Sequence, residues 1–202
     1  MVAELSDSAA AGIAPDGDVI LVVGAGMKRL KAYSLVLKNA SKVFSAMLNP
    51  RFSEGRRLAE NQSTEIDMPE DDAEAMEIML NVIHGYNDAV RDGLGADQIL
   101  RLAITADKFD CRIALAFAIK DWLKCADISD SYQLWQLLKA AYWFDNAKSF
   151  GEISLALMLH HQGSYLTLWA QDDIDTEVLI RICREFELFC FCSEKGSKIL
   201  GG

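Results

Sequence analysis

The first candidate for a ligand-binding site in this chain is a pair of glycines that follows an apolar run. The stretch DVILVVGAGMKRL contains Gly24-Ala25-Gly26, and the phosphate-binding turn of a dinucleotide enzyme begins in this way. That fingerprint also needs a third glycine, where Arg29 stands, and an acid about 20 residues further on. No Asp or Glu occurs from Val19 to Ser53, so a nucleotide-binding enzyme is a remote alternative.

Cysteines and histidines offer a candidate metal site. Cys183, Cys190 and Cys192 could bind zinc with a histidine, but their spacing is not that of a zinc finger. Cys183 and Cys190 also share one face of a predicted helix, which is typical of a core stripe. His160 and His161 are adjacent, so on a helix they point about 100° apart and cannot bind one metal from one face. The sequence therefore predicts no metal and no cofactor.

Nucleophiles and carboxylates show no catalytic arrangement either. The sequence contains no G-x-S-x-G nucleophile motif. A cluster of acids lacks the alternating ligand spacing of a calcium loop, and it fits the solvated start of a helix: Glu70, Asp71, Asp72, Glu74 and Glu77. We therefore predict no catalytic residue and expect that the protein is not an enzyme.

Composition narrows the classes of partner. The chain has 202 residues, 51% of them hydrophobic, and a net charge of −10. This acidic balance argues against nucleic-acid binding, which depends on Lys and Arg. The six basic residues between Val19 and Ser53 fit a solvated strand face, with a steering patch for an acidic partner as the alternative.

Membrane and redox signals set the expected location. No apolar run approaches the ~18 residues that a membrane span needs, and the N-terminus does not resemble a signal peptide. The five cysteines are an odd number, and most lie in apolar patterns. We therefore expect reduced, buried thiols and a cytoplasmic or nuclear protein.

Hydrophobic spacing predicts three short strands. Val19–Val23 is a continuous apolar run, an alternating pattern extends a second strand to Ser34, and Thr64–Met68 alternates again. Gly24 and Gly26 would turn the chain between the first two strands, as an antiparallel hairpin.

Helical patterns fill most of the remaining chain. Ser41 is expected to cap a helix that carries Phe44, and residues 49–63 are expected to form a loop. A helix is predicted to begin at Asp71-Asp72 and to bury Ala73, Met76, Leu80 and Ile83, and another to begin at Asp97 and to bury Ile99, Leu102, Ala103 and Ala106. A central helix is predicted over 112–125. Three further helices are predicted over 131–144, 149–162 and 176–191.

This order of elements resembles the BTB (POZ) domain. The resemblance is carried by GDVILVVG with Asp18 at its head, LKAYSLVLKNASKVFSAML with Leu35, Leu37, Ser41 and Phe44 in register, FSEG, TEIDMPEDDAEAMEIMLNVIHG and ILRLAITADKFDCRIALAFAIKDWL. The chain departs from the family where Tyr33-Ser34 replaces a common His-Lys pair and where His84 replaces an aromatic residue before Gly85. The remainder resembles the C-terminal helical extension of short fungal BTB proteins.

The resemblance implies the fold and its division. We expect an α+β, mainly helical protein in which a small sheet packs with a helical cluster and is followed by a helical extension. The predicted parts are a flexible N-terminal arm over 1–16, a BTB/POZ domain over 17–125, the helical extension over 126–192 and a flexible tail over 193–202.

The resemblance also implies a non-catalytic protein–protein interaction module. In relatives that recruit a cullin scaffold of ubiquitin ligases, a hydrophobic-x-Glu motif lies in the loop where Phe52, Ser53 and Glu54 stand here. Phe52 would then insert into an apolar pocket beside a polar contact of Glu54, or else it would only pin the loop to its own core. The alternative function is oligomerisation or regulatory scaffolding with no ligase link. The expected partners are proteins, including a second copy, and neither a membrane nor a small-molecule substrate.

Overall fold

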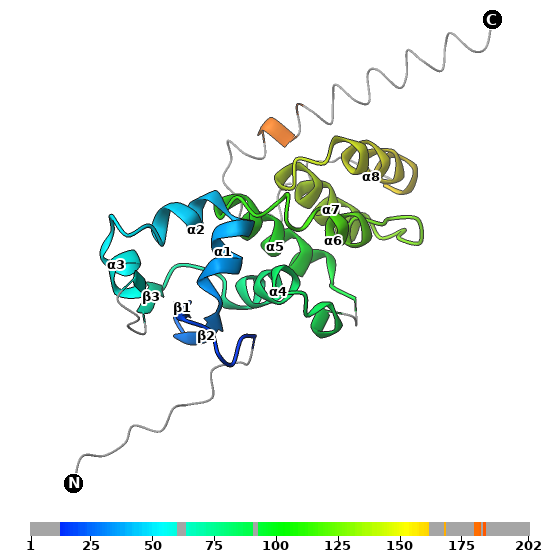
Figure 1. Ribbon diagram of the computed structural model, residues 1–202. Coiled ribbons are helices and arrows are strands. Elements are labelled where there is room, and N and C mark those ends of the chain that lie inside the picture. The colour runs from blue at the N-terminus through cyan, green and yellow to red at the C-terminus, as the bar shows by residue number, and fades with distance from the viewer. Residues whose placement is uncertain are drawn as a thin grey trace, which may run out of the picture. The chain divides into compact units, whose positions relative to one another are not determined.

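The protein is described here by a computed structural model, which covers residues 13–59, 64–90 and 93–161, with Leu168, 180–182 and Arg184. Over these residues the fold is α+β and mainly helical with one three-stranded sheet, which confirms the predicted fold class (Figure 1). The chain forms two compact units. Unit 1 contains Met1–Leu94 and Ile104–Ile119, and unit 2 contains Gly95–Ala103 and Lys120–Gly202. The predicted domain boundary at residue 125 stays a prediction.

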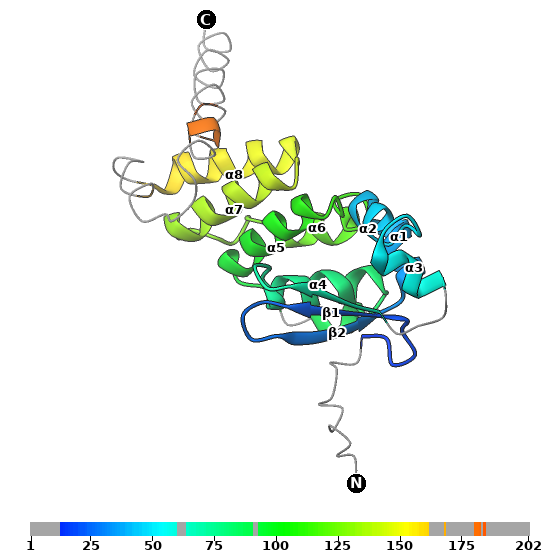
Figure 2. The ribbon, with the colours of Figure 1, turned by 90° about the vertical axis from the view of Figure 1, so that its left-hand side faces the viewer.

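A hairpin and a parallel third strand make the sheet of unit 1. Strand β1 (Val19–Val23) pairs antiparallel with β2 (Lys28–Ala32), as Figure 2 shows, and parallel with β3 (Thr64–Met68). The order of the strands is therefore β2-β1-β3. The apolar run of β1 suits its central place. The alternation of β3 buries Ile66 and exposes Asp67, as the sequence predicted.

The turn between β1 and β2 differs from the prediction in one detail. Gly24 has a φ of 73°, and its carbonyl accepts the Met27 N–H at 2.9 Å. The second left-handed residue is Met27, with a φ of 51°, and not Gly26. Strand β2 follows directly at Lys28, so the helix that a dinucleotide fingerprint requires is replaced by a strand. The nucleotide-binding alternative therefore fails at this turn.

Two short helices follow the hairpin. Helix α1 covers Ser34–Ala40 and α2 covers Lys42–Met47. Strand β2 ends two residues before the predicted Ser34, because the N–H of Ser34 is bound by the Asp18 carboxylate as the helix begins. The predicted cap of α2 is confirmed, since Ser41 Oγ accepts the Phe44 N–H at 2.9 Å.

Helix α3 (Ser53–Ala59) occupies part of the stretch that was predicted as loop, so that prediction was wrong. Its sequence, SEGRRLA, contains good helix formers, and its glycine serves close packing. Helix α4 (Ala73–Ile83) is capped by Asp72, whose Oδ1 accepts the N–H groups of Glu74 and Ala75. The buried residues of α4 are Ala75, Met76, Met79 and Leu80. The predicted inward face contained Ala73 and Ile83 in place of Ala75 and Met79. A short 3-10 helix, η1, covers Asn87–Val90.

The next two helices correct the sequence prediction in different ways. Helix α5 (Ala96–Lys108) buries the predicted residues, but it begins one residue before Asp97, and Gln98 Oε1 accepts the N–H of Gly95 at its start. Helix α6 (Ala116–Trp122) is much shorter than the predicted 112–125. The predicted central helix was wrong, because Ile113 and Phe117 are 84% and 88% exposed.

Unit 2 is built on a helical hairpin. Helix α7 (Ser131–Trp143) and helix α8 (Ala147–His160) lie side by side (Figures 1 and 2) and are capped by Asp130 and Asn146. Their ranges agree with the prediction to within two residues. The predicted helix over 176–191 falls largely outside the described residues.

Candidate partner-binding surface

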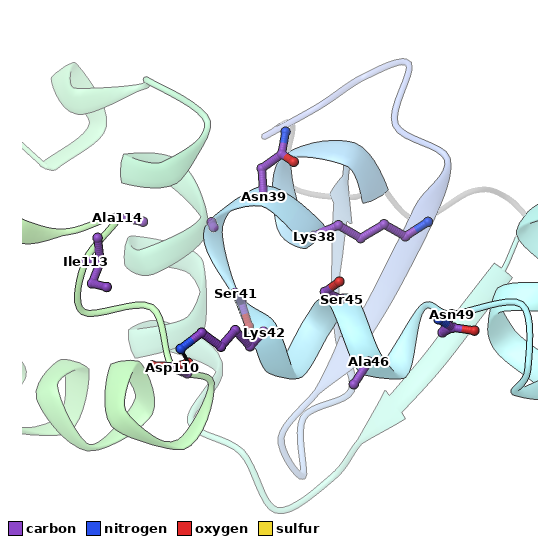
Figure 3. Close-up of a pocket in the computed structure, with 11 residues that line it drawn as sticks. Lys38, Asn39, Ser41, Lys42, Ser45, Ala46, Asn49, Asp110, Ile113 and Ala114 are labelled. Carbon is purple, nitrogen blue, oxygen red and sulfur yellow. Dashed lines mark ion pairs between the residues drawn. The ribbon is translucent and has the colours of Figure 1, made fainter.

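A groove on unit 1 is the central feature of the candidate site. It has a volume of about 480 Å³ and runs between the α1–α2 pair and the segment 110–114. Figure 3 shows Lys38 and Asn39 from α1, Ser45 and Ala46 from α2, and Ile113 and Ala114 on the facing wall. We call this cavity the first groove. Its walls mix polar and small apolar side chains, as a protein-binding surface does.

Ser41 joins the two walls of the first groove. Besides capping α2, its buried hydroxyl donates a hydrogen bond to the carbonyl of Phe109. The Phe44 and Phe109 rings stack behind it, with centroids 4.8 Å apart and planes at 10°. One residue further on, Lys42 Nζ lies 3.7 Å from Asp110 Oδ2, which is the dashed ion pair in Figure 3. These contacts fix the distance between the walls.

Phe52 lies at the edge of the first groove. Its N–H donates to the carbonyl of Asn49 at 2.9 Å, and Asn49 lines the groove. The Phe52 side chain is 55% exposed, so it is not part of the buried core of unit 1. Phe52 and Ser53 are thus brought to the start of α3, and the side chain of Glu54 lies outside the described part of the structure.

Gly55 sets the position of Phe52. A Cβ at residue 55 would lie 2.1 Å from the Asn49 carbonyl oxygen and 2.8 Å from the Leu48 carbonyl carbon. Only glycine lets the first turn of α3 pack directly on the backbone that ends α2. The glycine in FSEG therefore fixes the backbone of the predicted anchor next to the end of α2.

Two exposed apolar side chains lie on the facing wall and on the helix that follows it. Ile113 lines the first groove, and Phe117 follows it four residues later. The prediction missed both, because 112–125 is apolar on most sides and was interpreted as a central helix. Leu115 and Ile119 form the buried stripe, while Ile113 and Phe117 form a second, exposed one. Sequence alone cannot tell whether a second apolar stripe faces a core or a partner.

The start of α1, which carries one wall of the groove, is held by groups distant in sequence. Asp18 accepts the N–H and the hydroxyl of Ser34, both at 2.6 Å. Partial burial acts to raise the pKa of Asp18, but the hydrogen bonds from Ser34, with a smaller effect of the charge on Lys38, leave it lowered. The carboxylate therefore stays ionised and caps the helix.

The two departures from the family pattern meet at this same helix start. His84 Nε2 accepts the N–H of Tyr33 at 3.1 Å, and the two rings stack with centroids 6.1 Å apart. His84 Nδ1 lies 2.8 Å from the Leu80 carbonyl and therefore carries the proton. Burial lowers the pKa of His84, although the bond to Leu80 opposes that shift.

The cysteines and the other candidate metal ligands form no catalytic or metal site within the described residues. Cys111 and Cys125 are free thiols, and burial raises the pKa of Cys111 to about 11 and also raises that of Cys125, so neither is an activated nucleophile. Cys183, Cys190 and Cys192 lie outside the described residues.

Within the described residues no three His, Cys, Asp or Glu side chains form a metal-binding group. Nor is any helix in that part of the chain long and apolar enough to cross a bilayer.

Comparison with known families decides the identity of the fold. A family model of the BTB/POZ domain matches residues 16–117. The chain belongs to the BTB/POZ family. This confirms the resemblance found in the sequence, and BTB/POZ domains are non-catalytic modules that bind protein partners and oligomerise. No curated protein is similar enough to the chain to count as a match.

Proposed function

We propose that this BTB/POZ protein is an adaptor that binds the N-terminal domain of a cullin-type ubiquitin-ligase scaffold. The observation that supports the proposal is the exposure of Phe52 beside the first groove. A large aromatic side chain held in water by a fixed backbone is typical of an interface anchor. We also propose that the protein is located in the cytoplasm or the nucleus.

The first groove suits a helical partner. Ile113 and Phe117 are the most exposed large apolar residues among those described, so burying them would add apolar area to the contact. Lys38 lines the groove with no ion pair in the described part of the chain, which favours an acidic side chain on the partner. A groove of this size accepts the side chains along one face of a helix.

Titration of the purified full chain against a cullin N-terminal domain tests the proposal. Phe52→Ala combined with Glu54→Ala should weaken binding by about tenfold or more, because truncating an interface anchor costs on the order of 2 kcal/mol. Tyr86→Ala is the matched control. Tyr86 is another exposed aromatic of unit 1, at 47%, and it does not line the first groove, so affinity should not change.

Two results would contradict the adaptor proposal. One is no binding at cullin concentrations on the order of tens of micromolar, a range in which specific adaptors bind. The other is binding that the double substitution leaves unchanged, since the contact would then lie elsewhere.

The second candidate function is oligomerisation with no ligase link. Leu35 on α1 is 68% exposed and offers an apolar contact for a second copy. Light scattering on the full chain should then give a mass above that of one chain, and Leu35→Lys should return it to 22.4 kDa. A monomer that binds the cullin domain would favour the adaptor alone.

A further inference from the structure

A second groove lies along a different stripe of α2. It has a volume of about 330 Å³, and α2 contributes Val43 and Met47 to it, whereas Lys42, Ser45 and Ala46 face the first groove. Residues one apart on a helix point about 100° apart, so the two grooves flank the same helix. The opposite wall comes from the end of β3 and the turn before α4, with Met68 and Pro69.

The floor of the second groove is apolar. Val43 and Met47 are half-buried, Met68 is 5% exposed, and the ring of Phe109 is 2% exposed. These side chains leave a surface on which a flexible aliphatic chain can lie. Methionine adapts its shape to such a ligand at low cost.

The rim of the second groove is negatively charged. Asp67, Glu70 and Asp71 line it, and Lys108 is the single base among the lining residues that the structure describes. Lys108 is already neutralised, because its Nζ bonds Asp71 Oδ1 at 2.6 Å and lies 5.6 Å from the Phe109 ring centroid. Asp67 and Glu70 are exposed and have no hydrogen bond or ion pair within the described part of the chain. The groove therefore carries two uncompensated carboxylates.

We propose that the second groove binds a basic segment of a protein partner, with one Lys or Arg side chain in the groove. The aliphatic stem of that side chain would lie over Val43, Met47 and Pro69, and its cation would meet Asp67 and Glu70. Lys and Arg combine a long apolar stem with a charged end, which matches an apolar floor under an acidic rim. The charge of this site is opposite in sign to that of the first groove, and the proposal does not depend on cullin binding.

Binding of short peptides to the full chain tests this proposal. The probes are three pools of ten-residue peptides with alternating apolar positions, in which the other positions are Lys/Arg, Asp/Glu or Ser/Gln. Amide cross-peaks in NMR spectra report where each pool binds. The Lys/Arg pool should shift the signals of Val43, Met47, Asp67 and Lys108, and the other two pools should not.

Substitutions separate the groove from the overall acidity of the chain. Asp67→Asn with Glu70→Gln should weaken binding of the Lys/Arg pool about tenfold. Asp16→Asn with Asp88→Asn removes the same charge from two exposed acids outside the groove, and it should leave binding nearly unchanged. Met47→Lys, which puts a cation of the chain itself over the groove floor, should also abolish binding.

Three outcomes would overturn the proposal. The first is no shift at the groove residues at peptide concentrations of about 1 mM, where even weak contacts are seen. The second is equal weakening by the two charge-removing pairs, since the attraction would then come from net charge alone. The third is self-association of the chain that Asp67→Asn with Glu70→Gln abolishes while no peptide binds, since the occupant would then be a second copy.

Discussion

The contact between His84 and Tyr33 shows how one side chain can tie two helices together. The neutral imidazole donates through Nδ1 to the Leu80 carbonyl and accepts the Tyr33 N–H through Nε2. It thus joins the end of α4 to the start of α1 with one ring. Protonation would turn Nε2 into a donor and break the second bond.

His84 should make stability depend on pH. Because the folded pKa is lowered, the unfolded chain takes up the proton first, so the free energy of unfolding should fall as the pH drops below the ordinary value of about 6.5. The loss should be complete once the pH is below the folded pKa. His84→Gln keeps an acceptor but does not titrate, so its urea midpoint should change less between about pH 7.5 and 5.5 than that of the parent.

His160→Gln is the control for this comparison, because His160 is exposed and bonds no group of α1. It should retain the pH dependence of the parent protein. Equal pH dependence in the parent and in His84→Gln would show that His84 does not supply the effect.

At the level of elements, the packing of α3 on the end of α2 decides where Phe52 lies. Ser41 and the ring stack of Phe44 on Phe109 hold α2 from one side, and the buried Gly55 lets α3 approach from the other. The backbone that carries the candidate anchor and one wall of the first groove therefore depend on three short helices, α1, α2 and α3. None of them is long enough to be stable without its neighbours.

Gly55→Ala should displace α3. The added Cβ would meet backbone atoms, which cannot rotate away, so we expect a loss of about 1–3 kcal/mol in the free energy of unfolding. Under the adaptor proposal, cullin binding should weaken as well, because the backbone that carries Phe52 would move with α3. Gly26→Ala is the matched control, since its Cβ would meet nothing within 4 Å and its φ is not in the left-handed region. Urea unfolding measures both, and equal effects would contradict the packing role of Gly55.

On the scale of the whole molecule, one helix is shared between the two units. Helix α5 spans Ala96–Lys108, yet Gly95–Ala103 belongs to unit 2 and Ile104–Ile119 to unit 1. Helices form cooperatively, so unfolding one part of α5 should destabilise the remainder. We therefore expect the two units to unfold together.

Leu21→Ala tests this cooperativity. Leu21 is fully buried in β1 of unit 1, so its truncation should cost about 2–5 kcal/mol. All four tryptophans, at 122, 135, 143 and 169, belong to unit 2. A urea midpoint measured by tryptophan fluorescence should therefore fall although the substitution lies in unit 1. An unchanged tryptophan transition, together with a lowered transition for the amide signals of β1, would show that the units unfold independently.

Local patterns determined most of the secondary structure. The apolar run of β1, the alternation of β3 and the Ser41 cap predicted elements that the structure contains, because each depends on residues near one another in sequence. The errors lie where distant groups intervene. Asp18 ends β2 by binding Ser34, and the backbone of Asn49 receives Gly55 in a stretch that was predicted as loop.

The sequence by itself determined the family, the mainly helical α+β class and the place of the candidate anchor at Phe52, because motif order and periodicity are local properties of the chain. Only the tertiary structure decided that Phe52 is exposed, that Ile113 and Phe117 face solvent, and that two grooves of different charge flank α2. Exposure and cavities depend on which apolar face of each helix packs against another element of the fold. That choice is made by packing between segments far apart in sequence, which no local pattern encodes.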